Sequence, residues 1–201
     1  MIQTKGKLNS KLHIDTRFYL HHFDGYIYLQ PQQEYRLTIR GAFPVFSYEQ
    51  CNARLVGGDL GIVYEPLSQL KLRSDWSYIR GTNTTDELPL NFMPPLNSRQ
   101  SATYEMAQWK SWRNVKIEVE HRYTSKQWYW NESLDFIPPP QGFHFWEVHL
   151  GGRLDLFSRP PQFRIGIENL LNTTYRDYLN RQRYFADAIG RNFTLSWIQN
   201  F

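Results

Sequence analysis

The side chains that most often carry chemistry are few and scattered in this chain. Its histidines are His13, His21, His22, His121, His144 and His149. None has the spacing of a Cys/His or His-x-x-x-His metal motif, and surface solvation explains the adjacent pair at 21 and 22 better than metal binding does. The single cysteine, Cys51, permits neither an internal disulfide nor a cysteine-based metal cage. We therefore predict no metal site and no cofactor.

Glu118 and Glu120 come nearest to a catalytic pair. In a strand, residues i and i+2 project from one face about 7 Å apart, and paired carboxylates can hydrolyse glycosides. The sequence suggests no pocket around them, and it contains no nucleophile elbow, phosphate-binding loop or dinucleotide fingerprint. We therefore predict that the protein is not an enzyme and has no catalytic residue.

Charged side chains of both signs recur at every second position of several segments. A ladder of hydrated ion pairs on the wet face of a sheet explains this pattern, and a surface lining a substrate passage is the alternative. The members of this row are Lys71, Arg73, Asp75, Lys116, Glu118, Glu120, Arg122, Glu147, Arg153, Asp155, Arg164, Glu168 and Arg191.

Ligand recognition, if the protein has any, is expected in its long loops. Tyr175, Arg176, Arg181 and Arg183 lie together near the C-terminus. Guanidinium groups bind carboxylates through paired hydrogen bonds, so this cluster could hold an anionic ligand. An earlier loop offers Tyr35, Arg40 and Tyr48.

The elements that position these residues are strands, and the C-terminal one is the most informative. It reads GRNFTLSWIQNF over residues 190–201, and Phe193, Leu195, Trp197 and Phe201 share one of its faces. In a soluble protein, so long and apolar an edge strand would promote aggregation. It suits a strand whose apolar side meets lipid and whose edge closes a barrel.

The same period-two alternation predicts about nine strands along the chain. Short turns, including a tight one at 22–25, alternate with long loops at 31–50, 81–97, 129–142 and 168–189. The glycines at 57 and 58 indicate a bulge or the close approach of another backbone. The strands are expected at 7–21, 26–30, 53–64, 69–78, 98–108, 115–124, 143–157, 163–168 and 190–201.

Composition excludes several classes of protein. No run of about 18 apolar residues is present, which excludes a membrane-spanning helix. A mean hydropathy of −0.60 still suits a spanning barrel, because its alternating strands are polar on average. The net charge is only +4 and the basic residues are spread singly, so we expect no nucleic-acid partner.

Three stretches resemble the C-terminal barrel of TonB-dependent outer-membrane transporters. The first, ELPLNFMPPLNSRQSATYEM, resembles a proline-bearing external loop and the strand after it, which carries Tyr104. The second, FRIGIENLLNTTYRDYLNRQRYFADAIGRNFTLSW, resembles the last two strands, with the Asn169-Leu170 segment and the closing Gly-Arg-Asn-Phe. The third is the terminal Phe201, and a weaker match spans 52–59, where Asp59 replaces the usual Glu.

This resemblance implies an all-β, antiparallel transmembrane barrel in the outer membrane of a Gram-negative cell. Residues 1–201 would form the C-terminal part of a barrel of roughly 22 strands, with short periplasmic turns and long extracellular loops. The plug domain and the N-terminal strands would be absent. TonB and the plug domain would therefore be partners only through that missing N-terminal part. The start, MIQTKGKLNS, lacks the apolar core of a signal peptide, which also fits a piece of a longer protein.

The implied function is uptake of a scarce nutrient, such as siderophore-bound iron, haem or cobalamin. Membrane lipid and the barrel-assembly machinery are the implied partners, the small-molecule ligand stays unknown, and the charged row would face the lumen. The residues that fit the assembly signal are Gly190, Phe193, Leu195, Trp197 and Phe201.

Two other architectures remain open at this point. One is a smaller autonomous outer-membrane barrel that acts as a pore or an adhesin. The other is a soluble β-sandwich that binds carbohydrate through its many aromatic residues.

Overall fold

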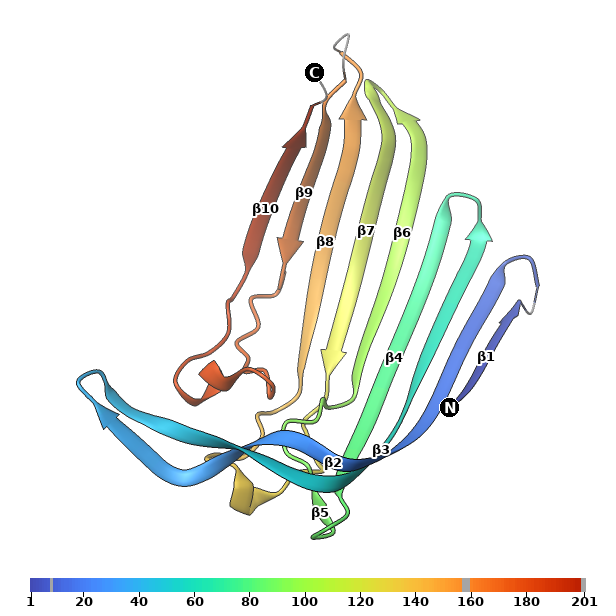
Figure 1. Ribbon diagram of the computed structural model, residues 1–201. Coiled ribbons are helices and arrows are strands. Elements are labelled where there is room, and N and C mark those ends of the chain that lie inside the picture. The colour runs from blue at the N-terminus through green and yellow to red at the C-terminus, as the bar shows by residue number, and fades with distance from the viewer. Residues whose placement is uncertain (8, 157–159, 200–201) are drawn as a thin grey trace.

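A computed structural model describes residues 1–7, 9–156 and 160–199. They form one antiparallel sheet in which each strand pairs with its neighbours in sequence, in the order β1-β2-β3-β4-β6-β7-β8-β9-β10, while the short β5 pairs with β4. The sheet is strongly curved and open, with β1 at one edge and β10 at the other (Figure 1). The expected all-β antiparallel fold is therefore confirmed.

The strands have unequal lengths. The three long loops, which connect β4 to β6, β7 to β8 and β9 to β10, lie at one end of the sheet, together with the far part of the β2–β3 hairpin, and the short turns between β3 and β4 and between β6 and β7 lie at the other (Figure 1). The strands are β1 (Ile2–Lys7), β2 (Leu12–Thr38), β3 (Gly41–Leu67), β4 (Leu70–Asn83), β5 (Leu88–Pro89), β6 (Asn97–Trp109), β7 (Trp112–Thr124), β8 (Phe143–Leu154), β9 (Gln162–Glu168) and β10 (Asn192–Ile198).

Helix is almost absent from the part of the chain that the structure describes. It is limited to two short 3-10 turns, η1 (Glu132–Leu134) and η2 (Arg181–Tyr184). Both lie in long loops, and neither has the length or apolarity needed to cross a membrane.

The two faces of the sheet differ in character. One face, here called the polar face, carries the charged row. The other, the apolar face, carries large hydrophobic side chains that stay exposed, such as Phe18 at 63%, Leu150 at 43% and Leu195 at 73%. A soluble monomer rarely exposes so much continuous apolar surface. No second sheet covers this face among the described residues, so the architecture is not a sandwich.

The largest error of the sequence prediction concerns residues 31–50, which were expected to form a loop. They extend β2 and β3 into a hairpin that pairs as far as Thr38 with Gly41. Pro31 and Pro44 suggested a loop because proline cannot donate to a ladder. Beyond the pairing with β4, which reaches Ala53, each strand has one free edge, so a proline there interrupts no second ladder.

The tight turn expected at 22–25 is also wrong, although the cue behind it is real. Gly25 does adopt a positive φ of 78°, which a residue with a side chain rarely reaches. Here that conformation forms a bulge inside β2, where the register shifts between Phe23 and Tyr26. A positive-φ glycine inside an alternating segment thus marked a bend rather than a reversal.

The strand predicted at 7–21 begins only at Leu12, in β2, and β1 (Ile2–Lys7) was not predicted. At the C-terminus, β10 covers 192–198, shorter than predicted. Phe201 and the predicted turn residues 158 and 159 lie outside the described residues.

Gly57 confirms the predicted close approach, whereas the bulge is absent because the β2–β3 register runs on unbroken there. A Cβ built at Gly57 would lie 2.6 Å from the carbonyl oxygen of Tyr78 and against the ring of Tyr19. Only glycine leaves room for that tyrosine to lie flat on the strand.

Gly57→Ala should therefore destabilise the folded sheet by about 1–3 kcal/mol, because the backbone oxygen cannot move aside cheaply. Urea unfolding in detergent, followed by tryptophan fluorescence, measures the change. Gly151→Ala is the matched control, since a Cβ there would meet its nearest neighbour, the carbonyl oxygen of Phe163, at an ordinary contact distance of 3.6 Å. Equal unfolding midpoints for the two variants would contradict the steric explanation.

Candidate functional site

The charged row lies on one face, as the cross-strand register shows. Lys71 pairs through Thr103 with Glu118 and His149. In the next row, Arg73 pairs through Ser101 with Glu120 and Glu147. The predicted members Asp75, Arg122, Arg153 and Arg164 belong to this face by the same alternation.

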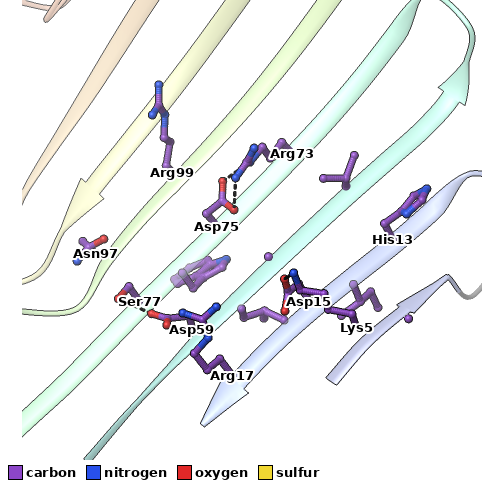
Figure 2. A pocket seen from close by; sticks show the side chains of 16 residues that line it. Lys5, His13, Asp15, Arg17, Asp59, Arg73, Asp75, Ser77, Asn97 and Arg99 are labelled. Carbon is purple, nitrogen blue, oxygen red and sulfur yellow. Dashed lines mark hydrogen bonds and ion pairs between the residues drawn. The ribbon is translucent and has the colours of Figure 1, made fainter. Parts of the chain in front are cut away.

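A hollow of about 880 Å³ opens on the polar face over β1 to β6 (Figure 2). Arg73 donates to Asp75 at 2.5 and 3.0 Å, and Ser77 donates to Asp59 at 2.8 Å. Lys5 pairs with Asp15 at 3.4 Å, while Arg17 also lines the hollow. Lys5, Asp15, Arg17 and Asp59 were missed in the charged row, although their alternation along the strands would have revealed them.

Glu120 is the centre of a second cluster, over β6, β7 and β8. Its side chain is 1% exposed and forms ion pairs with Arg99 at 2.6 Å and with Arg122 at 2.7 Å. Arg122 also donates to Glu147 at 3.2 Å, so one guanidinium links two carboxylates that lie directly opposite each other and would otherwise repel. The predicted ladder of hydrated ion pairs needs a correction here, because neighbouring side chains cover both carboxylates, while Arg99 and Arg122 stay about half exposed.

The long loops are held together by another buried ion pair. Arg183 in η2 contacts Asp135 at 2.6 Å, and their side chains are 1% and 0% exposed. The Tyr184 hydroxyl donates to the other oxygen of Asp135 at 2.8 Å. Because the partners lie 48 and 49 residues apart, this cluster fastens the β7–β8 loop to the β9–β10 loop.

The ionisation of Tyr184 makes this fastening sensitive to alkali. Burial, the hydrogen bond to Asp135 and the charge of that carboxylate raise the pKa of Tyr184. The protonated phenol therefore stabilises the folded loops fully below the pKa of an unfolded tyrosine, about 10, and this stability is lost as the pH rises toward the folded value. We expect the loops to open above about pH 10, as followed by near-ultraviolet circular dichroism.

Tyr184→Phe should shift this alkaline transition to higher pH while weakening the loops at neutral pH. Tyr48→Phe, which alters a side chain that is 80% exposed, is the control and should leave the transition unchanged. An identical transition in wild type and Tyr184→Phe would show that another group governs it.

The four predicted ligand contacts in the last loop all make contacts within the protein. Arg183 is buried against Asp135, and Arg176 pairs with Asp187 at 2.6 Å. The ring of Tyr175 packs on Phe143 and Phe145, at centroid distances of 4.6 and 4.4 Å. Arg181 lies over the Phe46 ring at 4.9 Å and has no carboxylate partner among the described residues.

The outer part of the β2–β3 hairpin lies across these loops (Figure 1). Phe46 contacts Phe92 and Phe136 at centroid distances of 6.3 and 5.7 Å. Phe43 contacts Phe185 at 6.2 Å. The hairpin, which we call the external ribbon (residues 31–50), thus packs on all three long loops. The other predicted candidates Tyr35, Arg40 and Tyr48 lie on or beside its strands rather than in an irregular loop.

Within the described ranges, no group of three or more His, Cys, Asp or Glu side chains is arranged to hold a metal ion. Two histidines do meet, with His121 Nε2 3.0 Å from His144 Nδ1. Glu118 pairs with Lys116 at 2.9 Å, and Glu120 is enclosed by arginines. These carboxylates balance charge, and they lack the free acid and base that a hydrolase needs.

Comparison with known proteins gives matches in structure only. No family model and no curated protein sequence matches the chain. Among solved structures, the copper transporter OprC superposes with a TM-score of 0.73 at 21% identity, covering 97% of this chain and 29% of its own. BauA, the ferric preacinetobactin receptor from Acinetobacter baumannii, superposes with a TM-score of 0.69 at 18% identity, and the match covers 98% of this chain and 28% of BauA. The FrpB iron transporter from Neisseria meningitidis (F3-3 variant) superposes with a TM-score of 0.63 at 14% identity, and the match covers 93% of this chain and 29% of FrpB.

The chain has the fold of one portion of a TonB-dependent transporter barrel. It spans less than a third of the length of the transporters that it matches. In such a barrel wall, one face of every strand looks into the lumen and the other looks outward.

The predicted assembly signal lies at the β10 edge of the barrel portion. Phe193, Leu195 and Trp197 share its apolar face and are 68%, 73% and 66% exposed. Gly190 precedes the strand, and a Cβ at this position would lie 2.7 Å from Asn172 Oδ1. The loop geometry thus gives this glycine a local role, while recognition by the assembly machinery stays a prediction.

Proposed function

We propose that this chain forms the C-terminal part of an outer-membrane TonB-dependent transporter that takes up a scarce nutrient. The observation that carries the proposal is the match of nearly the whole chain to part of three transporter barrels. Exposed apolar side chains along one face of the sheet support it, because hydrocarbon is the solvent that makes such a face favourable.

A small autonomous barrel is less well supported. Its sheet would have to close on itself, whereas β1 and β10 are the two ends of the sheet order in the described residues. A wall with two open edges fits one sector of a larger barrel. The plug and the remaining strands would then be supplied from outside residues 1–201, and with them the contact to TonB.

The three matched proteins are named as a copper transporter, a ferric preacinetobactin receptor and an iron transporter. We therefore propose a metal, free or chelated, as the first substrate class to test, ahead of haem and cobalamin. Among the predicted contacts, Arg181 is the best candidate to bind an anionic metal chelate, because its charge is not neutralised by a carboxylate in the described structure. Tyr175, Arg176 and Arg183 would act by holding the loops around it.

The test is uptake in cells that lack the gene, compared with complemented cells. Radioactive copper, a ferric siderophore and free ferric iron are supplied separately, with and without a protonophore. We expect deletion to abolish energised uptake of one of these and the protein to fractionate with the outer membrane. A soluble product that folds without detergent would overturn the proposal in favour of another class of protein.

The ligand role of Arg181 is tested by Arg181→Gln in the complemented strain. Reduced uptake at normal protein level would support it. Lys110→Gln, which removes a positive charge from the short turn between β6 and β7, far from the long loops, is the matched control. Unchanged uptake in Arg181→Gln would exclude this residue as a ligand contact without affecting the membrane assignment.

A further inference from the structure

On three neighbouring strands, the side chains of the apolar face change from apolar to basic toward the long loops. On β2, β3 and β4 its row is apolar through Leu20, Val56 and Tyr78, which are 52%, 46% and 45% exposed. The next positions on this face toward the long loops are basic. They are His22, Arg54 and Arg80.

The register brings these basic side chains together. His22 is the direct partner of Arg54, and Arg80 is the direct partner of Val56, two positions along the strand from Arg54. Side chains in such diagonal positions on one face lie about 7–8 Å apart or less. The three therefore form a compact patch, here called the basic patch.

Neither arginine of this patch is neutralised by a carboxylate among the described residues. The Arg80 guanidinium instead lies over the ring of Tyr129, 3.7 Å from its centroid. The Tyr129 hydroxyl shares a hydrogen bond of 3.1 Å with Thr82, which fixes the ring. On the polar face, by contrast, Arg73, Arg99 and Arg122 are each paired with a carboxylate.

Tyr129 also reports the presence of both guanidinium groups. Burial raises the pKa of this tyrosine, but the hydrogen bonds from Thr82 and Arg80 and the charges of Arg80 and Arg54 outweigh burial and lower it. Arg80 and Arg54 therefore both lie close enough to the Tyr129 hydroxyl to influence its ionisation.

We propose that the basic patch binds the phosphate groups of an anionic glycolipid in the outer leaflet of the outer membrane. This rests on the proposed function, which places the apolar face against lipid. An amphipathic ligand fits because acyl chains would cover Leu20, Val56 and Tyr78 while its phosphates reach Arg54 and Arg80. Planar guanidinium groups match phosphate oxygens in two-point hydrogen bonds, and cations at a membrane surface attract anionic lipid heads.

The experiment uses the full protein extracted from outer membranes in a neutral detergent. Native mass spectrometry counts bound molecules during titration with diphosphoryl lipid A. We expect Arg54→Gln/Arg80→Gln to bind it about thirtyfold more weakly, since each arginine near a membrane surface contributes about a factor of five. Arg17→Gln/Arg153→Gln, which removes the same charge from the polar face, should bind within about twofold of wild type, because neither residue lies on the apolar face.

Two further arms identify the source of the phosphate. Dephosphorylated lipid A should bind wild type as weakly as diphosphoryl lipid A binds the patch variant. Inorganic phosphate in excess should not displace lipid A, because it lacks the acyl chains. Displacement by inorganic phosphate, or equal lipid A binding by the patch variant and the wild type, would overturn the proposal.

Failure of the proposed function would look different. In that case the wild-type protein would not be found in the outer-membrane fraction. A protein that inserts normally but binds lipid A independently of Arg54 and Arg80 would refute the basic patch alone.

Discussion

Asp135→Ala should release the long loops from one another. The change leaves Arg183 charged, enclosed and without its partner, and removing one member of a buried ion pair costs about 3–5 kcal/mol. The Nε of Arg183 already has no hydrogen-bond partner in the described structure, and its remaining contacts, the rings of Tyr178 and Tyr184 and the carbonyl of Pro138, carry no full negative charge. We expect hydrogen exchange of the backbone amides in η1 and η2 to accelerate by about two to three orders of magnitude.

Two variants make this expectation specific. Asp187→Ala breaks the pair with Arg176, whose side chains are 38% and 49% exposed, and should cost about 1 kcal/mol or less. Asp135→Leu/Arg183→Leu removes both buried charges and should recover part of the loss. Exchange in Asp135→Ala no faster than in Asp187→Ala would show that the buried pair does not hold the loops.

Glu120→Gln should destabilise the barrel wall itself. The change leaves Arg99 and Arg122 without their shared carboxylate at a site where Glu120 is 1% exposed. Because the two arginines are 57% and 46% exposed, solvent compensates in part, and we expect a loss of about 2–3 kcal/mol rather than the full cost of a buried pair. Equilibrium unfolding by urea in detergent measures it.

Glu118→Gln is the matched control on the same strand and face. Its partner Lys116 lies at 2.9 Å, and the two side chains are 23% and 48% exposed. This exposed pair should contribute about 1 kcal/mol or less. Equal losses in the two variants would mean that burial of Glu120 adds nothing to its pairing.

The strands that the sequence predicted well are those with one wet and one apolar face. Residues 98–108 and 115–124 were expected as strands, and β6 and β7 cover 97–109 and 112–124. Period two is a strong signal there, because a slip of one residue would move every charge onto the apolar face. The external ribbon also alternates, with Tyr35, Leu37 and Ile39 at every second position. Its prolines and glycine nevertheless indicate a loop, and that signal outweighed the alternation in the prediction.

The candidate site was less predictable, for a different reason. Alternation places Glu120 on a strand, and the sequence places Arg183 in a long loop, but whether water reaches either side chain depends on partners distant in sequence. Asp135 carries no local cue that it will meet Arg183, 48 residues away. Both the assignment of Glu120 to a hydrated ladder and the choice of Arg183 as a ligand contact therefore missed burial that only the folded loops and strands create.

The tip of the external ribbon has a consequence for the evolution of the protein. Leu37 is 81% exposed, and Ile39 at the turn is fully exposed. Substitutions there disturb neither the wall nor the loop cluster, so purifying selection on stability is weak at this point. We therefore expect this tip to tolerate substitution and insertion better than the strands of the wall.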